Sequence, residues 1–481
     1  MQATQSTPDV VWISLESVRA DHTSLGGYER DTTPNLRRIV EAGGVYYPST
    51  FATARWTPAV STSMLTGTYQ STHRVGWDDT RTVRRVPDDL RTLPERLRDL
   101  GYRTALFSSN PYVSPATGLD RGFDRVHLPP TKDDLKSGTG ARTALRYATT
   151  FARDGAGFTT GLKWHKNCIL PTYQAETLKA WIRGYAAEDE PFFVYTHMNS
   201  SHHPYDPPLK VLERFMGDLD MTPQETIDHA KTFTNNIWEV VANGCELSER
   251  DRTALFAVYD AEIYLADRFV GELFDLVRRS GRPTVFVVVG DHGELFGEQG
   301  MLGHNVTLHD GLVHVPLVTY GLDGVAAAAE GLVQPIDVTR TLVASLGGDV
   351  SGFQGVDLRD VELGGEGPGA REYALFQRGP RARDLNTILE YNPAFDRPYH
   401  VEAIDAIRST EWKYCRSADR IALYRLPDEE TDVSDAFPDV VAELDAALDA
   451  AIPEENYADP DAAAAEFDDT MRRHLVDLGY L

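Results

Sequence analysis

The chain has 481 residues, of which 73 are acidic and 47 are basic, so its formal charge is −26, while 42% of its residues are hydrophobic. A disordered chain of this charge would lack the apolar material for a core, so the composition indicates a folded protein. The length suggests two or more structural units. The acidity argues against nucleic acid and against an anionic membrane as partners, because both carry negative charge.

Acidic residues occur along the whole chain, and the basic residues comprise eight Lys beside 39 Arg. This distribution favours adaptation to high salt, where screening removes the self-repulsion of a strongly charged surface. We therefore expect the melting temperature to rise between low and molar KCl. A flat or falling trend would contradict a halophilic protein.

Residues 1–9 contain neither a basic region nor an apolar run, and no stretch of about 18 apolar residues occurs elsewhere. We expect no membrane span and no secretion signal. Cys168, Cys245 and Cys415 are odd in number and far apart. This spacing argues against a disulfide framework and favours buried thiols in a reduced, cytoplasmic compartment.

Short β-branched runs alternate with amphipathic stretches, a pattern typical of an α/β fold with a mostly parallel sheet. In chain order, the sequence predicts a strand over 10–15, helices over 35–42 and 93–100, strands over 103–107 and 191–195, a large surface helix over 255–278, a strand over 284–289 and a helix over 335–346.

A glycine-rich break at 364–369 predicts a boundary near residue 365. Residues 1–365 would form a catalytic α/β domain, and residues 366–481 a smaller C-terminal α+β subdomain. Residues 129–175 are polar and irregular, which indicates an insertion over the main sheet.

Polar residues follow two of the predicted strands directly. Glu16 follows the first strand, and Asp291 and His292 follow the strand over 284–289. Ligands of open α/β sheets bind at the carboxyl ends of the strands. If the two strands are neighbours, two carboxylates and an imidazole meet at one edge, and such a set would hold a divalent cation.

Thr57 stands where a helix N-cap belongs, since Pro58 suits the first helical position and Gly67 the end of the helix. A helix N-terminus stabilises an anionic phosphate or sulfate group. A hydroxyl there could also be a nucleophile if an adjacent metal ion activates it. Taken alone, Thr57 would be only a capping residue.

With these residues in place, the chain resembles the sulfatase family of the alkaline phosphatase superfamily. The resemblance begins with ESVRADH at 16–22, GY at 27–28 and TPNL at 33–36. It continues in order through LTGTY at 65–69, His73, GYRT at 101–104, GFD at 122–124, HHPYDPP at 202–208, DHGE at 291–294, His304, VPL at 315–317, Arg408, WKY at 412–414, ALYRLP at 422–427 and EET at 429–431. It implies a three-layer sandwich around a central, mostly parallel sheet.

The chain departs from typical sulfatases at the nucleophile. Their C/S-x-P-x-R pattern is matured to formylglycine, but here Thr57 occupies the nucleophile position and Ser61 the Arg position. Thr cannot form that aldehyde, so no formylglycine is expected. Sulfatases usually have Asp at the position of Glu16. The combination of Glu16 with Thr57 resembles the corresponding residues of phosphoethanolamine transferases and lipoteichoic acid synthases.

The resemblance implies a role for each matching residue. Glu16, Thr57, Asp291 and His292 would ligate a divalent cation (Mn, Zn, Ca or Mg), and Arg19 and Asp21 would support these ligands by hydrogen bonds. Catalytic His202 and His304 would face the substrate or hold a second metal, with Arg55 also binding substrate, whereas His203 would point elsewhere if its segment is extended. We interpret GLKWH at 161–165 as a chance match to a sulfatase substrate motif.

The leading hypothesis is a metal-dependent hydrolase of sulfuric or phosphoric esters in which the Thr57 alkoxide attacks and His304 or His202 protonates the leaving oxygen. Alternatives are direct attack by water, a phosphotransferase or phosphodiesterase that moves a phospho-group to an acceptor hydroxyl, and a non-catalytic binding protein that keeps the fold. The substrate would be a small anionic ester, on a carbohydrate or lipid headgroup for example. The sequence does not indicate an oligomeric state.

Overall fold

The computed structural model describes residues 7–78, 83–128, 138–154, 169–325, 331–360, 371–396, 399–452 and 463–477. Its centre is a seven-stranded sheet in the order β2-β9-β6-β1-β5-β3-β4, in which β9 runs against the other strands. The strands are β1 (Asp9–Leu15), β2 (Val45–Tyr46), β3 (Arg103–Ser108), β4 (Arg125–His127), β5 (Phe192–Met198), β6 (Thr284–Gly290) and β9 (Leu317–Tyr320). The predicted mostly parallel sheet is confirmed.

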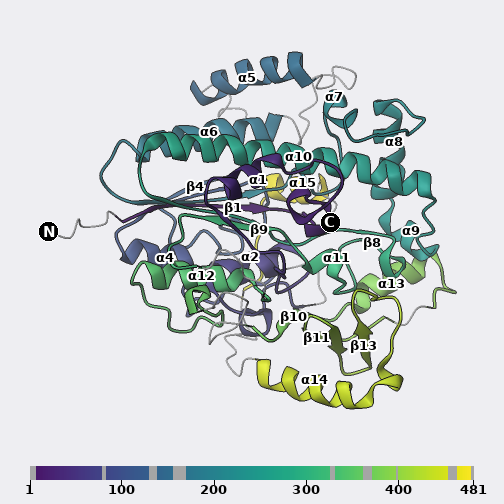
Figure 1. The fold of residues 1–481 in the computed structure, drawn as a ribbon. Coiled ribbons are helices and arrows are strands. Elements are labelled where there is room, and N and C mark those ends of the chain that lie inside the picture. Colours follow the sequence, from purple (N-terminus) through teal and green to yellow (C-terminus); the bar gives the residue numbers. More distant parts are fainter. Residues whose placement is uncertain are drawn as a thin grey trace.

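Helices cover both faces of this sheet and make three layers (Figure 1). One layer holds α1 (Pro34–Glu41), α5 (Gly138–Asp154), α6 (Ile169–Tyr185) and α10 (Glu249–Ser280), and the other holds α2 (Thr57–Thr66), α4 (Leu93–Asp99) and α12 (Pro335–Ser345). Other helices are α3 (Gln70–His73), α7 (Leu209–Leu212), α8 (Pro223–Thr234), α9 (Ile237–Ala242), α11 (Asp310–Val313) and α15 (Asp469–Asp477).

Two hydrophobic cores lie on opposite faces of the sheet, and β1 shows how the sequence builds both. Val11 and Ile13 pack into one core, whereas Val10 and Trp12 pack into the other. Successive side chains of a strand point to opposite faces, so a strand buried on both faces must be apolar throughout. This explains why apolar residues follow one another in these strands instead of alternating with polar residues.

A second, antiparallel sheet lies at one end of the molecule (Figure 1). It has the order β10-β11-β12-β13 and packs against α14. Its elements are β10 (Ala374–Arg378), β11 (Ile404–Arg408), β12 (Trp412–Arg416), β13 (Ile421–Arg425) and α14 (Pro438–Ala451), and α13 (Ala382–Tyr391) lies between β10 and β11 in the chain. The chain therefore has the expected smaller α+β unit, although the predicted boundary near residue 365 lies outside the described residues.

Three sequence expectations need correction or restriction. Helix α10 is longer than predicted and is no surface helix, because α1, α6 and α8 pack against it and many of its side chains, including Tyr259 and Glu262, are buried. The described parts of 129–175 are helical rather than irregular, since α5 and the start of α6 occupy them. Cys245 and Cys415 are buried, as predicted, and form no disulfide among the described residues, whereas Cys168 and the motif at 161–165 lie outside the described residues.

Helix α2 begins one residue earlier than the sequence suggested. Trp56 is the N-cap, with extended backbone angles, and Thr57 is the first helical residue rather than the cap. The hydroxyl of Thr57 is directed to Asp291 instead of to its own helix, which leaves the capping position to the preceding residue. Gly67 ends the helix with φ of 68°, as predicted.

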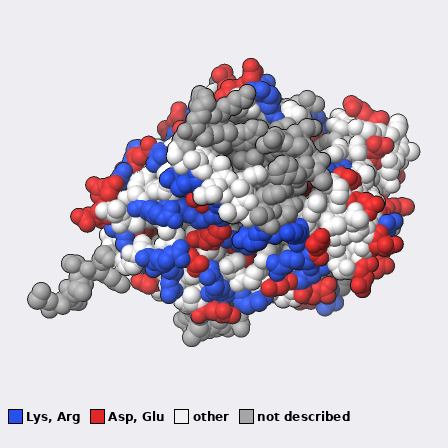
Figure 2. All heavy atoms as spheres, turned by 90° about the horizontal axis from the view of Figure 1, so that it is seen from above, with Lys and Arg blue, Asp and Glu red and all other residues white. Residues whose placement is uncertain are grey.

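Charged side chains of both signs are spread over the surface. Figure 2 shows basic and acidic residues side by side on one face, with acidic groups toward its margins. The net charge of −26 is therefore not concentrated in one acidic segment. Among the described residues, no helix is long and apolar enough to cross a membrane.

His73, at the end of α3, should make the stability of the protein depend on pH. Its Nδ1 accepts a hydrogen bond from the amide of Val75 (3.1 Å), its Nε2 lies 3.1 Å from the hydroxyl of Ser63, and the side chain is buried. Burial, aided by the charge of Arg74, lowers the pKa of His73 to about 3. The folded protein therefore holds this imidazole neutral.

The unfolded chain binds a proton on His73 below about pH 6.5, whereas the folded chain does so only near pH 3. The stability that His73 contributes is thus complete above pH 6.5 and is lost as the pH falls toward 3. We expect a loss of about 2 kcal/mol by pH 5, and His73→Asn should remove this component. Urea unfolding of the unchanged protein and of His73→Asn at pH 7, 6 and 5 measures this loss. If the free energy of unfolding fell equally with pH in the two proteins, the prediction would be wrong.

Candidate active site

Glu16 and Asp291 meet at one edge of the central sheet. Strands β1 and β6 are parallel neighbours, with Leu15 paired to Gly290, so the residues that follow them emerge side by side. Glu16, Asp291 and His292 are each fully buried. The predicted convergence of two carboxylates and an imidazole is therefore confirmed.

The segments that carry these residues are held rigidly. Ser17 adopts a left-handed φ of 58°, and the hydroxyl of Tyr259 donates a hydrogen bond to its carbonyl (2.5 Å). Gly293 approaches Gly311 so closely that a Cβ atom would lie 2.1 Å from the Gly311 carbonyl oxygen. Only glycine can follow His292 here, because any side chain would push the two segments apart.

The hydroxyl of Thr57 is surrounded by the other three predicted ligands. Its Oγ1 lies 3.0 Å from Asp291 Oδ2, 3.3 Å from Glu16 Oε1 and 3.3 Å from His292 Nε2. His292 Nδ1 lies 2.9 Å from the Gly293 carbonyl, which can only accept, so Nδ1 carries the hydrogen and Nε2 presents its lone pair. One hydroxyl proton cannot satisfy three acceptors at once.

This donor set fits a divalent cation. Two buried carboxylates within reach of one hydroxyl repel each other, and such charges are tolerated inside a protein when a cation compensates them. Asp291 Oδ1 accepts the amides of Ser17 (3.0 Å) and His292 (2.6 Å), which leaves Oδ2 for the centre of the site. Oxygen ligands with one imidazole suit Mn, Mg, Ca or Zn.

Two residues that contact Glu16 were not predicted from the sequence. Asn110 Nδ2 donates to Glu16 Oε1 (2.8 Å), and His197 Nε2 lies 3.1 Å from Glu16 Oε2. Burial alone would lower the pKa of His197, but the hydrogen bond to Glu16 and the negative charges of Glu16 and Asp291 together outweigh burial and raise this pKa. His197 lies on β5, the neighbour of β1, and Asn110 follows β3, so the strand order would have identified both.

Three histidines gather next to this group. The ring of His304 lies 4.6 Å from that of His292 and 5.0 Å from that of His202, between centroids. The prediction that His203 points away from this group is wrong. Its ring lies 4.3 Å from that of His202 and 5.7 Å from that of His304, between centroids. Residues 201–204 form bends instead of a strand, so side chains do not alternate there.

The predicted arginines differ in position. Arg55 is buried, its Nη1 donates to the His304 carbonyl, and its Nε has no partner among the described residues. Arg19 pairs with Asp21 (2.7 Å) and donates to the Glu294 carbonyl (3.0 Å). Arg19 thus stabilises the segment after His292. Asp21 contacts Arg19, so its effect on this segment is exerted through the Arg19 guanidinium.

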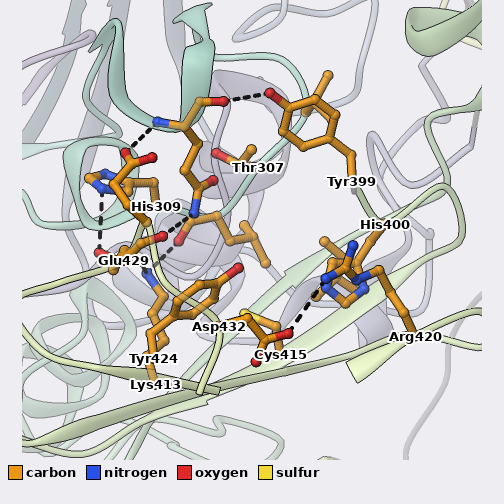
Figure 3. Close-up of a pocket in the computed structure, with 15 residues that line it drawn as sticks. Thr307, His309, Tyr399, His400, Lys413, Cys415, Arg420, Tyr424, Glu429 and Asp432 are labelled. Carbon is orange, nitrogen blue, oxygen red and sulfur yellow. Dashed lines mark hydrogen bonds and ion pairs between the residues drawn. The ribbon is translucent and has the colours of Figure 1, made fainter. Parts of the chain in front are cut away.

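A separate pocket lies between the antiparallel sheet and the segment that follows Glu298. Its volume is about 160 Å³, and it contains none of the predicted site residues. Figure 3 shows Tyr399, His400 and Tyr424 around it, with Lys413 and Glu429 at its base. The predicted site and this pocket are therefore different features of the molecule.

The central sheet carries a buried group of polar side chains at one edge, and comparisons with known proteins give the class of this α/β protein. The family model described as Sulfatase matches residues 8–348, so the chain belongs to the sulfatase family. An arylsulfatase of Klebsiella aerogenes is 24% identical over 60% of this chain and 67% of its own length. Arylsulfatase K of Bos taurus is 23% identical, and the match spans 55% of that protein.

Solved structures share the fold at low sequence identity. The phosphonate monoester hydrolase of Agrobacterium radiobacter has a TM-score of 0.70 and 21% identity, with 92% of this chain and 96% of that one covered. A 2-O GAG sulfatase has a TM-score of 0.67 and 16% identity, with 97% and 96% covered. The three-layer, alkaline-phosphatase-like architecture expected from the sequence is thus confirmed.

Proposed function

We propose that this protein hydrolyses sulfuric or phosphoric esters with the Thr57 hydroxyl as nucleophile and a divalent cation held by Glu16, Thr57, Asp291 and His292. The observation that carries this proposal is the position of Thr57 Oγ1, within 3.0–3.3 Å of the other three side chains. A hydroxyl this close to two carboxylates and a bare imidazole nitrogen is suited to losing its proton when a cation is bound.

The cation, when bound, would lower the pKa of the hydroxyl and offset negative charge on the ester. Thr57 Oγ1 then attacks phosphorus or sulfur, and the bond to the leaving oxygen breaks as that oxygen takes a proton. The Nε of Arg55, which has no hydrogen-bond partner in the described part of the chain, and the N-terminus of α2 favour binding of the remaining oxygens. Water afterwards cleaves the Thr57 ester and releases sulfate or phosphate.

In this proposal the leaving group or the ester oxygens lie toward the imidazoles of His202 and His304. Both are buried, and the ring of His304 lies 4.6 Å from that of His292 and 5.0 Å from that of His202, between centroids, so a group bound to Thr57 could contact them. We assign to them the binding of the ester and the protonation of the leaving oxygen.

The substrate class follows from the chemistry and from the named neighbours. One solved neighbour, with a TM-score of 0.64, was determined in complex with its substrate D-glucosamine-2-N,6-O-disulfate, and others are phosphonate monoester hydrolases. A small anionic ester, carried on a carbohydrate for example, suits a site with a buried guanidinium beside the nucleophile.

A covalent trapping experiment tests this function. The protein, reconstituted with Mn, Zn, Ca or Mg, is assayed on aryl sulfates, phosphate monoesters, phosphate diesters and phosphonates, and is quenched with acid during turnover. Mass spectrometry should find the peptide of Thr57 heavier by one phosphoryl or sulfuryl group. Turnover without any modified Thr57 would instead support direct attack by water, and no turnover on any ester would contradict the proposal.

A further inference from the structure

The pocket between the antiparallel sheet and the segment after Glu298 contains two polar atoms that need a partner. Its volume is about 160 Å³, and Thr307 and His400 are among the side chains that line it. Both side chains are only 7% exposed. Thr307 Oγ1 and His400 Nε2 make no hydrogen bond within the described part of the chain. Buried polar groups are nearly always hydrogen-bonded, so two such atoms in one pocket indicate a ligand that bonds to them.

The other nitrogen of His400 decides what Nε2 can offer. His400 Nδ1 lies 2.6 Å from Ser417 Oγ, and the hydroxyl of Ser417 donates to Asp419 Oδ1 (2.7 Å). This hydroxyl has one proton, so Ser417 Oγ accepts from His400 Nδ1, and Nε2 presents a lone pair. Burial, aided by the charges of Arg420 and Arg378, lowers the pKa of His400 to about 4, so the ring is neutral near pH 7. His400 therefore offers the pocket a hydrogen-bond acceptor.

Aromatic and apolar side chains line the same pocket. They include Tyr399 and Tyr424, which Figure 3 shows around the cavity, and Leu308 and Ile404. Ligand sites usually combine such a surface with a few polar groups that orient the ligand. A cavity of about 150 Å³ in another protein holds benzene, so the volume here suits a ligand with one six-membered ring.

The charges around the pocket favour an uncharged ligand. Lys413 Nζ donates to Glu429 Oε2 (2.7 Å), and Arg420 Nη2 lies 3.6 Å from Asp432 Oδ2. Glu430, the remaining acidic residue of the lining, is exposed. A sulfate or phosphate group would meet three carboxylates and two cations that already have acidic partners, so an anion is disfavoured. A cationic ligand would have to compete with Lys413 and Arg420 for the same carboxylates.

We propose that this pocket binds an uncharged sugar in its six-membered ring form. One ring hydroxyl would donate to His400 Nε2, and another would bond to Thr307 Oγ1, which can both donate and accept. The carbon–hydrogen faces of the ring would pack against Tyr399 and Tyr424. The charged and amide groups of the lining can bond to the remaining hydroxyls, which a phenol of the same ring size lacks.

The pocket is joined to the active site through Arg378. Its Nε donates to the Val306 carbonyl (2.7 Å), and its Nη2 donates to the His400 carbonyl. Val306 follows His304 closely, so a bound sugar would lie near the segment that carries a proposed ester-binding residue. The sugar could be a free molecule or an uncharged unit of a carbohydrate chain that carries the ester, and only the second source rests on the proposed function.

Titration calorimetry of the full chain with D-glucose, D-galactose and D-mannose tests the pocket without reference to activity. We expect at least one of these sugars to bind with a Kd of about 1 mM, as the small size of the ligand implies. Thr307→Val keeps the shape of the side chain and removes the hydroxyl, and His400→Leu removes the acceptor, so each should weaken binding by about tenfold. Thr232→Val, a change at an exposed threonine of α8, is the matched control and should leave the Kd unchanged.

A second set of measurements separates this pocket from the active site. Thr57→Ala should bind the sugar as tightly as the unchanged protein, whether or not Thr57 is the nucleophile. Loss of binding in Thr57→Ala, with binding kept in Thr307→Val, would place the sugar in the active site and overturn the proposal. Binding of none of the sugars, or of phenol alone, would also overturn it. Circular dichroism melting shows that each variant is folded.

A disaccharide distinguishes the two sources of the sugar. Cellobiose that binds at least as tightly as D-glucose, and that loses affinity in Thr307→Val, would show that the pocket accepts a unit of a chain. Exclusion of cellobiose, with D-glucose still bound, would show that the pocket is a site for a free sugar. Both results support an uncharged sugar as the ligand.

Discussion

Thr57→Ala is expected to lower kcat/KM by at least about 10⁴-fold, since loss of the nucleophile costs about 10⁶-fold in subtilisin. The change removes the attacking oxygen itself, which lies 3.0 Å from Asp291 Oδ2. A 10⁴-fold loss corresponds to roughly 5.5 kcal/mol of transition-state stabilisation. The fold should survive, because Thr57 is the first residue of α2 and alanine favours helices. Steady-state assays on an aryl sulfate and a phosphate monoester measure the effect.

Thr57→Ser is the matched control for this change. It keeps a hydroxyl at the same position and loses one methyl group, worth about 1 kcal/mol, so activity should stay within about tenfold of the unchanged protein. The metal content of both variants is measured in parallel. Activity of Thr57→Ala above about 1%, a loss of less than roughly 3 kcal/mol, would show that Thr57 is not the nucleophile.

The sequence was sufficient to predict the centre of the site because its parts are set by local rules. Glu16 and Asp291 each follow a continuous apolar strand, and Gly67 ends the helix that Thr57 begins. Parallel strands bring the residues after their carboxyl ends to one edge, so only the adjacency of β1 and β6 had to be assumed. The structure shows that adjacency directly.

The rest of the site depends on chain paths that local patterns do not encode. His197 lies within an apolar strand and Asn110 in a loop after another strand, and both reach Glu16 only through the order of strands in the sheet. The position of His203 depends on the bends at 201–204, which the assumption of an extended segment could not provide. Long-range topology, rather than residue type, separates what was predicted from what was missed.

The net charge of −26 and an anionic substrate are compatible because the acidity and the site occupy different places. Acidic side chains are spread over the surface (Figure 2), whereas the residues around Thr57 are buried and include Arg55. Buried groups are screened by salt much less than surface groups. Added salt would therefore weaken repulsion of the substrate by the surface more than its attraction to the site.

Lys413→Met is expected to lower the free energy of unfolding by about 3–5 kcal/mol, because it leaves the buried Glu429 carboxylate without its cation, whereas Asp310 keeps its ion pair with Arg408. Lys413 lies on β12 and is buried, and its Nζ donates to Asp310 Oδ1 (2.9 Å), Glu429 Oε2 (2.7 Å) and the Leu308 carbonyl (2.5 Å). Burial alone would lower the pKa of Lys413, but Asp310 and Glu429 outweigh burial and raise this pKa.

The same change should also loosen the link between the antiparallel sheet and the active site. The Glu429 carbonyl accepts from the side chain of Gln299, on the segment that leads to His304, and Figure 3 shows Glu429 between this segment and Lys413. We therefore expect Lys413→Met to lower kcat as well, although Lys413 is not a residue of the proposed site.

Urea unfolding of Lys413→Met beside Lys231→Met isolates the effect of burial. Lys231 forms an ion pair with Asp206 (3.0 Å), but the Lys231 side chain is 28% exposed. Water can solvate Asp206 after Lys231 is lost, so that change should cost no more than about 1 kcal/mol. Adding Glu429→Gln to Lys413→Met should recover part of the larger loss, because it removes the unpaired charge of Glu429. Equal losses for the two lysines would show that Lys413 is not an essential compensating charge.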